Sequence, residues 1–230
     1  MKQDEIFAAG EGDQWFERNR LRLAPVEPLK TDPVLRVIAL AGLRPQKAVE
    51  IGASNGSRLH ILWQLYHCEV TAIEPSEAAI AHGRASYPEV DFVQGIASSL
   101  PLEYDGKFDL VIVNGVFCWI DRSTLLRSCA EIDRLLAENG FLVVGDFLPP
   151  SPERVNYHHR TDVNLFTYKQ NYANIFLATS LYAQFASLVF NHEQWTCDPQ
   201  TAAKDRYQVC VLKKTGQEAY VTREFHPARA

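Results

Sequence analysis

Apolar residues in the middle of the chain come in short runs that alternate with stretches of helical periodicity. The run Phe-Asp-Leu-Val-Ile-Val at 108–113 is apolar at nearly every position, as is typical of a parallel strand covered on both faces. Between the runs, residues such as Leu59, Leu62 and Tyr66 recur at the spacing of a helix face. The alternation predicts an α/β fold with a doubly wound, mostly parallel sheet between two helical layers. The five predicted strands are 48–51, 70–73, 90–93, 108–113 and 141–144.

The two ends of the chain depart from this alternation. The N-terminal stretch is polar with scattered aromatic residues, and its helix signals predict a cap of short helices. Prolines after the fifth strand predict an inserted loop that is too long for a simple connection. A last helix and an antiparallel pair of strands then complete a seven-stranded sheet whose last strand is antiparallel. These elements are predicted at 168–185 for the helix and at 187–195 and 206–213 for the strands.

Turn signals also mark the helix before the fifth strand. Asp121 is placed to cap the start of that helix, and Asn139-Gly140 has the chemistry of a turn that ends one. We expect the whole chain to form one domain. Its expected parts are a helical cap (1–43), a core (44–146), an inserted loop (147–166), a C-terminal helix and strand pair (167–214) and a tail (215–230).

Composition narrows the classes of partner and the cellular location. The formal net charge is −5 and the isoelectric point about 5.8, which disfavours a broad phosphate-binding surface, so we expect no nucleic acid partner. Neither a signal pattern nor an apolar run near the roughly 20 residues of a membrane helix is present, so we expect no membrane partner. The five cysteines form no C-x-x-C pair and predict a reducing, cytoplasmic setting. The oligomeric state stays open.

Distinctive residues follow four of the predicted strands. The carboxyl ends of parallel strands are where open sheets of this kind bind ligands. Glycines after the first strand let the backbone approach a ligand closely, and a carboxylate after the second can accept hydrogen bonds from both hydroxyls of a ribose. The candidate cofactor-binding residues are Glu50, Gly52, Ala53, Ser54, Asn55, Gly56, Glu74, Pro75, Gly95, Ile96, Ala97, Asn114, Gly115, Val116 and Trp119.

The order of these motifs resembles the class I S-adenosylmethionine-dependent methyltransferases over roughly residues 48–146. Glu50, Gly52 and Gly56 match the first motif of the family, and Glu74 matches the acid that holds the ribose. The resemblance implies S-adenosylmethionine as cofactor, with Asn114 near its methionine part and Trp119 packed near the adenine. The third motif departs from the family, because Ile96 stands where an aspartate usually receives the adenine amino group. Backbone groups at Ile96 and Ala97 would then have to form the hydrogen bonds with the adenine ring.

Other interpretations of the same residues remain open. A nicotinamide-binding domain would carry G-x-G-x-x-G, whereas Ser54 here breaks that spacing and disfavours a pyrophosphate cradle. A non-catalytic domain that keeps the fold and the cofactor would serve as a partner protein. Residue by residue, the glycines could be plain turn residues, Glu74 a solvated strand end, Trp119 part of the core and Asn114 a turn residue.

Methyl transfer needs an acceptor atom held in line with the methyl group, and a hydroxyl acceptor usually needs a general base. The inserted loop offers His158 and His159 as candidate catalytic residues, with Tyr157 and Arg160 beside them. Two adjacent histidines without a third spaced ligand are poor evidence for a metal, so we expect none. The alternative is that both are plain polar loop residues.

The N-terminal cap is the second region where an acceptor or a lid could be found. Candidate lid or substrate residues there are Trp15, Phe16, Arg18 and Asn19. The fourth strand lacks the Asn/Asp-Pro-Pro-Tyr signature that resembles amino methylation of bases and amides. We therefore expect a small-molecule methyl acceptor and O-methylation, and faint similarity to enzymes of surface polysaccharide or natural-product assembly suggests a sugar or natural-product intermediate.

Overall fold

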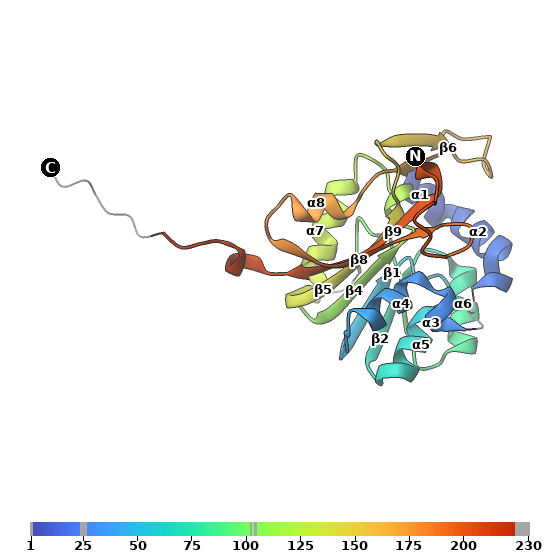
Figure 1. Ribbon diagram of the computed structural model, residues 1–230. Helices are drawn as coiled ribbons and strands as arrows, with labels where there is room; N and C mark the ends of the chain where they lie inside the picture. The colour runs from blue at the N-terminus through green and yellow to red at the C-terminus, as the bar shows by residue number, and fades with distance from the viewer. Residues whose placement is uncertain (1, 24–26, 102, 104, 224–230) are drawn as a thin grey trace.

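The computed structural model describes residues 2–23, 27–101, 103 and 105–223, and a seven-stranded sheet forms its centre (Figure 1). The strands lie in the order β3-β2-β1-β4-β5-β9-β8. β9 runs antiparallel to both of its neighbours, and the other six strands are parallel to one another. The predicted sheet is thereby confirmed. Its strands are β1 (Lys47–Ile51), β2 (Glu69–Glu74), β3 (Asp91–Gln94), β4 (Phe108–Asn114), β5 (Leu136–Phe147), β8 (Tyr182–Asn191) and β9 (Arg206–Lys214).

Helices cover both faces of the sheet because successive strand residues point to opposite sides. Leu110 and Ile112 of β4 join one buried cluster, and Val111 and Val113 join the other. The first cluster lies under α4 (Pro33–Leu40), α5 (Ser57–Tyr66) and α6 (Glu77–Ser86), and the second under α7 (Leu125–Leu135) and α8 (Ala173–Leu177). Figure 1 shows the two groups of helices on opposite sides of the sheet. This three-layer packing leaves the strand ends free to carry a site.

The predicted helix at 168–185 is wrong. The segment instead contains the end of β7 (Phe166–Lys169), the single helical turn of α8 and the start of β8. β8 pairs with β9 over its whole length, a long-range contact that helical spacing of aromatic residues cannot reveal. Three aromatic residues of this segment, Tyr172, Phe176 and Tyr182, nevertheless pack into one core cluster.

The inserted loop contains regular structure that the sequence did not predict. β6 (Glu153–Asn156) pairs antiparallel with β7 and forms a separate two-stranded sheet. Two turn assignments also need correction. The residue at the N-cap of α7 is Thr124, while the Asp121 side chain accepts hydrogen bonds from the backbone N–H groups of Ser123 and Gln3. Asn139 lies inside β5, at a shift in its register with β4, and does not end the helix.

The N-terminal cap lies across the same end of the molecule as the hairpin of β6 and β7 (Figure 1). The Gln3 side chain bonds to the backbone carbonyls of Trp119 and Phe166, and the Phe166 N–H donates to its Oε1. Asp13 accepts hydrogen bonds from Ser76 and Ala78 at the start of α6. The cap consists of α1 (Gln3–Ile6), a π-helical stretch (Phe7–Glu11), α2 (Gly12–Asn19) and a 3₁₀ turn (Arg20–Arg22), followed by α3 (Pro28–Thr31).

Short 3₁₀ turns complete the described chain. They are Phe117–Trp119 after β4, Ala203–Asp205 before β9 and Gly216–Ala219 after it.

Candidate functional site

A cavity of about 670 Å³ opens where β1, β2 and β4 end beneath the N-terminal cap. Its volume lies in the range of small-molecule and cofactor sites, roughly 300–1,000 Å³. Most of the residues singled out at the strand ends line it, together with two from the cap. They are Trp15, Asn19, Glu50, Gly52, Ala53, Ser54, Asn55, Glu74, Pro75, Gly95, Ile96, Ala97, Asn114, Gly115, Val116 and Trp119.

The turn after β1 forms the floor of the cavity. Gly52 has a φ of +72°, and a Cβ at this position would lie 2.3 Å from a methyl carbon of Val116. A side chain there would therefore face both backbone strain and a clash. The Gly52 and Ala53 N–H groups donate to the Ile73 carbonyl of β2, which holds the turn against the neighbouring strand. Gly56 is the N-cap residue of α5 and does not belong to the cavity lining.

Glu74 is buried at the end of β2 and is held by two backbone groups. Its Oε2 accepts from the Ser54 N–H at 2.8 Å, and its Oε1 accepts from the Ser76 N–H at 3.0 Å. Burial raises the pKa of Glu74 to about 7, against the opposing effect of these two hydrogen bonds. Each carboxylate oxygen has further acceptor capacity for a ligand hydroxyl in the cavity.

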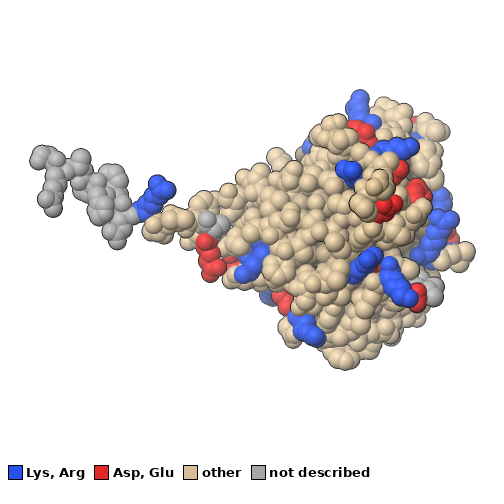
Figure 2. Space-filling view, in the orientation of Figure 1, with Lys and Arg blue, Asp and Glu red and all other residues tan. Residues whose placement is uncertain are grey.

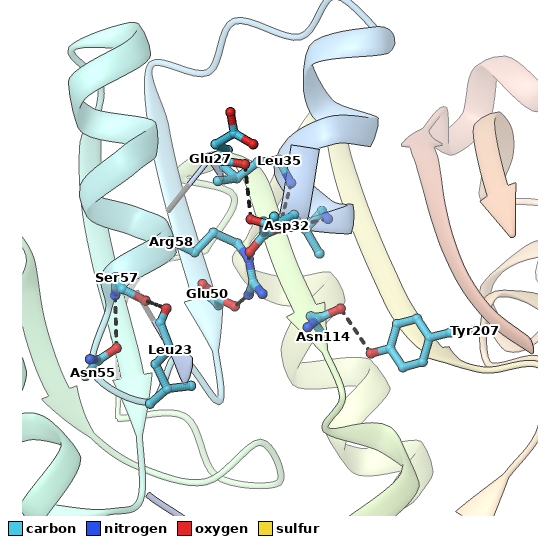
Figure 3. A network of polar contacts seen from close by, with 12 residues as sticks. Leu23, Glu27, Asp32, Leu35, Glu50, Asn55, Ser57, Arg58, Asn114 and Tyr207 are labelled. Carbon is cyan, nitrogen blue, oxygen red and sulfur yellow. Dashed lines mark hydrogen bonds and ion pairs between the residues drawn. The ribbon is translucent and has the colours of Figure 1, made fainter. Parts of the chain in front are cut away.

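A buried ion-pair network lies at the other side of the same turn (Figure 3). Arg58 of α5 bonds to Glu50 at the end of β1, and its Nε donates to Asp32 at 2.8 Å. One guanidinium therefore faces two carboxylates, all three lining the cavity. Glu50 is 1% exposed, and its Oε2 has no hydrogen-bond donor among the described residues. Burial raises the pKa of Glu50 to about 7, while Arg58 acts to lower it.

The sequence pattern did not reveal this network as a unit. Glu50 belongs to the first motif, whereas Asp32 and Arg58 belong to none of the motifs. Asp32 does cap α4, since its Oδ1 accepts from the N–H groups of Val34 and Leu35. Its other oxygen serves the network. No local spacing rule joins a helix cap to an arginine 26 positions later.

Aromatic rings close the cavity over the ends of β2 and β3. Trp119 stacks on Phe7 of the cap at 5.4 Å between ring centroids and meets the edge of Trp15 at 6.2 Å. Its Nε1 donates to Thr167 Oγ1. Trp119 is thus both a packing residue and part of the lining. Ile96 and Ala97 lie on this side and supply backbone groups and an apolar surface without a carboxylate.

A second wall of the cavity is built from residues that sequence reasoning missed. Tyr207 of β9 donates its hydroxyl to Asn114 Oδ1 at 3.1 Å (Figure 3). Asn114 can reach across β5 because its register partner is Gly145, where any Cβ would lie 2.1 Å from Asn114 Oδ1. Phe147 and Trp195 pack against Tyr207, and all of these except Gly145 line the cavity. Most of this wall lies after residue 146, beyond the region whose motifs resemble the methyltransferase family.

The two histidines of the inserted loop lie outside the cavity. His158 and His159 are exposed, with their ring centroids 3.9 Å apart, and neither belongs to the cavity lining. Burial and the nearby Arg18 lower the pKa of His159. Phe16 is also outside the lining and packs instead against His82 of α6.

Three of the predicted lid and loop residues form a polar cluster around the buried carboxylate of Glu11, outside the cavity lining. Arg18 of α2 and Tyr157 of the loop both bond to Glu11 Oε1, at 2.5 and 2.9 Å. Arg160 lies 3.8 Å from the other oxygen of Glu11, a side chain that is completely buried. This cluster ties the cap to the inserted segment, although none of its members lines the cavity.

The described part of the chain shows neither a metal site nor a membrane-spanning helix. Within it, no cluster of three or more His, Cys, Asp or Glu residues is arranged to hold a metal ion. No helix there is long and apolar enough to cross a membrane. On the face shown in Figure 2, Lys and Arg side chains are scattered among acidic ones and do not gather into a stripe.

The region around the cavity is similar to known methyltransferase sequences. The family model described as "Methyltransferase domain" matches residues 49–144. A probable S-adenosylmethionine-dependent methyltransferase of Mycobacterium tuberculosis is 32% identical over 103 residues, which cover 42% of this chain and 36% of that protein. A ubiquinone/menaquinone biosynthesis C-methyltransferase of Campylobacter jejuni is 27% identical over 119 residues, or 49% of each protein. The matched regions thus span half or less of these curated relatives.

Solved structures share the fold over most of the chain. A crystal structure of Burkholderia thailandensis 1,6-didemethyltoxoflavin-N1-methyltransferase, with 1,6-didemethyltoxoflavin and S-adenosylhomocysteine bound, has a TM-score of 0.69 at 16% identity. The alignment covers 94% of this chain and 91% of that one. A possible histamine N-methyltransferase from Thermotoga maritima gives a TM-score of 0.61 at 20% identity, covering 91% and 99%. At these identities the likeness shows the fold.

Proposed function

Because residues 49–144 form a methyltransferase domain of the class I, S-adenosylmethionine-dependent kind, we propose that this protein transfers a methyl group from S-adenosylmethionine to a small-molecule acceptor. The observation that carries the proposal is the charge balance of the cavity. Asp32 and Glu50 share the single guanidinium of Arg58, and one Glu50 oxygen has no donor among the described residues. Such a site favours a cationic ligand, and the α-ammonium group of S-adenosylmethionine is one.

The residues present fit this cofactor. Glu74 would accept hydrogen bonds from the ribose hydroxyls, and Glu50 would accept one from the ammonium group. Trp119, Ile96 and Ala97 offer a flat apolar cleft with backbone groups for the adenine ring. When bound, the cofactor supplies a methyl group already activated by a sulfonium.

The protein's own contribution is then to position groups and to exclude water. The cap covers the cavity with Phe7 and Trp15, which pack on Trp119. Gln3 anchors this cover to the loop after β4 and to β7. The aromatic wall of Phe147, Trp195 and Tyr207 bounds the part of the cavity next to Asn114, where an acceptor would meet the methyl group.

We further propose that the acceptor atom is a hydroxyl oxygen, on a sugar or a natural-product intermediate, and that the reaction takes place in the cytoplasm. Two observations support oxygen over an amine. The end of β4 reads Asn114-Gly115-Val116-Phe117 and lacks the signature that resembles amino methylation of bases and amides. The cavity also contains a histidine, His192, of the type that removes a hydroxyl proton.

Calorimetric titration with S-adenosylhomocysteine tests the cofactor, and titration with NADH is the matched comparison. We expect saturable binding of S-adenosylhomocysteine and none of NADH; the reverse result would exclude the proposed function. Transfer of a radioactive methyl group from S-adenosylmethionine to extracted small molecules then separates an enzyme from a non-catalytic binding domain. A protein that binds the cofactor yet labels none of them would favour the binding domain.

A further inference from the structure

We infer that His192 is the proton acceptor of the transfer reaction and that Phe147, Trp195 and Tyr207 form a pocket for a planar, hydroxylated ring as the methyl acceptor. This inference rests on the proposed function and, of its two acceptor classes, selects a natural-product intermediate with a planar ring over a sugar. All four residues line the cavity.

The position of His192 is fixed by the chain around it. It follows directly after β8, and its backbone N–H donates to the Asp205 carbonyl at 3.0 Å. Its ring packs edge-on against Phe147, with 5.5 Å between centroids. A quarter of the side chain is exposed, so the ring is held by packing and still open to the cavity.

The hydrogen-bond partners of His192 set which nitrogen can take a proton. Nδ1 lies 3.2 Å from the same Asp205 carbonyl, an acceptor, so the proton of the neutral ring belongs on Nδ1. Nε2 carries the lone pair of the neutral ring when the Glu193 side chain turns away from it, because a carboxylate oxygen at 3.0 Å faces an N–H group and not a lone pair. Glu193 Oε1 lies 3.0 Å from Nε2, and its side chain is three-quarters exposed. Glu193 can therefore stabilise the imidazolium once it forms and pass the proton to solvent.

The step balances without any further reactant. The acceptor oxygen forms a bond to the methyl carbon, and the methyl–sulfur bond breaks with its electron pair left on sulfur. The hydroxyl proton passes to Nε2 of His192. The positive charge of the sulfonium thus becomes the positive charge of the imidazolium, next to the Glu193 carboxylate.

The aromatic wall defines the shape of the acceptor. Tyr207 meets Phe147 at 5.6 Å and Trp195 at 5.1 Å between ring centroids, both edge to face. Rings in this arrangement present flat surfaces and edges to a ligand, which favours a planar aromatic body. Tyr207 also donates to Asn114, so the wall is continuous with the end of β4.

The backbone of Trp195 supports a role beyond packing. Its φ is +55°, a left-handed conformation that is unusual for a bulky residue and costs about 1 kcal/mol or more. The Trp195 N–H donates to the Asn191 carbonyl at 2.7 Å, which holds this conformation. Glycine would adopt it without strain. The chain keeps a large ring at a position where a small residue would fold more easily.

Binding of 7-hydroxycoumarin to the protein saturated with S-adenosylhomocysteine tests the pocket. We expect saturable binding that is at least tenfold weaker in Trp195→Gly and unchanged in Trp63→Phe, a partly exposed tryptophan on α5. Methyl glucopyranoside, with hydroxyls on a non-planar ring, should bind more weakly. No binding of 7-hydroxycoumarin, equal binding by Trp195→Gly or tighter binding of the glucoside would overturn the acceptor class.

Methyl transfer to 7-hydroxycoumarin tests the base. We expect His192→Ala to lower kcat at least 100-fold while its affinity for S-adenosylhomocysteine stays within twofold, and added imidazole to restore part of the rate. His67→Asn, a change at an exposed histidine on the far end of α5, is the control and should keep the wild-type rate. Failure of S-adenosylhomocysteine to bind the wild-type protein would instead reject the proposed function itself.

The rate profile with pH separates a catalytic from a merely structural His192. The charged groups around this corner are Glu193 and Lys169, whose Nζ lies 4.6 Å from the Phe147 ring centre, and Asp205, which contributes its carbonyl. The kcat of the wild type should fall at pH values low enough to protonate the base, and this fall should be absent in His192→Ala. Loss of activity in His158→Ala or His159→Ala with an unchanged His192→Ala, an unchanged pH profile, or no rescue by imidazole would overturn the assignment.

Discussion

Glu74 shows how one residue carries both the local fold and the proposed ligand contact. Its two oxygens accept from Ser54 and Ser76, so the carboxylate joins the turn after β1 to the turn after β2. Replacement by glutamine leaves one of these N–H groups facing an amide N–H group. Glu74 could be predicted from the sequence because the acid that binds the ribose stands about 20 residues after the first motif.

We expect Glu74→Gln to weaken S-adenosylhomocysteine binding by about 10- to 100-fold, since hydrogen bonds to charged groups contribute about 1.5–3 kcal/mol. Calorimetric titration of the variant measures this loss. Glu77→Gln, at an exposed position in the first turn of α6, is the matched control and should bind as the wild type does. Equal affinity of Glu74→Gln and wild type would contradict the assigned contact to the ribose.

The raised pKa values of Glu50 and Glu74 predict that cofactor binding depends on pH. Both pKa values lie at about 7 in the folded protein, against an ordinary value of 4.5, with burial as the main cause. Bound ammonium and hydroxyl groups favour the ionised carboxylates, so affinity should rise from pH 6 to pH 8, by up to about tenfold for each carboxyl group. Titrations in buffers of different ionisation enthalpy should show proton release at pH 6. Affinity that is flat over this interval would contradict the prediction.

The raised pKa values also predict how the free energy of unfolding changes with pH. A carboxyl group with a raised pKa keeps its proton in the folded protein where the unfolded chain has lost it. Its contribution to the free energy of unfolding is therefore fully present below about pH 4.5 and is lost as pH rises through about 7. Denaturant titrations of wild type and Glu74→Gln across this range should show a smaller dependence on pH in the variant; identical slopes would count against the shift.

Residues reached by long-range packing could not be predicted in the same way. Arg58, Tyr207 and Trp195 enter the cavity from a helix, the last strand and the connection before it. Their positions depend on how α5 and β9 lie against β1 and β5, and no short spacing in the sequence encodes that geometry. A tryptophan close to a predicted strand end was visible, but nothing local distinguished it from a packing residue.

At the scale of elements, the sequence predicted what local periodicity controls. Helix α5 and strands β1 to β4 lie close to their expected positions, and β5 contains the predicted strand 141–144, because each alternates cleanly with its neighbour. The region after residue 146 was predicted less well. β6, β7 and β8 gain their stability from pairing partners, and the segments carry aromatic residues that suit a helix face or a strand equally.

The link between cap and inserted segment yields a prediction about kinetics. Tyr157 donates to Glu11, a buried carboxylate whose Oε1 also accepts from Arg18. Tyr157→Phe removes one donor from that charge and should cost about 1–3 kcal/mol locally. We expect S-adenosylhomocysteine to dissociate roughly 3- to 10-fold faster while the fold is kept.

Stopped-flow displacement of S-adenosylhomocysteine measures this rate. Tyr220→Phe, which removes a hydroxyl at an exposed site near the end of β9, is the control. Unchanged dissociation in Tyr157→Phe would mean that the cap does not retain the ligand through this cluster. A change of equal size in both variants would point to a general loss of stability instead.

At the scale of the whole molecule, the sheet and the site have a common origin. The class I methyltransferase fold predicted from the ordered motifs is confirmed by the strand order and by the family match at residues 49–144. Strand alternation determines which edge of the sheet receives the motifs, and therefore where a cavity can form. The cap and the last two strands then close that edge from opposite sides, through contacts between residues more than 90 positions apart.

This closure predicts that ligand binding stabilises the cap as well as the core. A ligand at 100 times its dissociation constant stabilises a protein by about 2.7 kcal/mol, which for a chain of this size raises the melting temperature by roughly 5–10 °C. We expect S-adenosylhomocysteine to produce such a shift. Hydrogen exchange measured by mass spectrometry should slow in residues 3–22, since Trp15 and Phe7 pack over the proposed adenine site. Exchange in α7, which lies away from the cavity, is the internal reference. Slower exchange at β1 and β2 with an unchanged cap would show that the cap is a static support and would contradict its role as a cover that the cofactor orders.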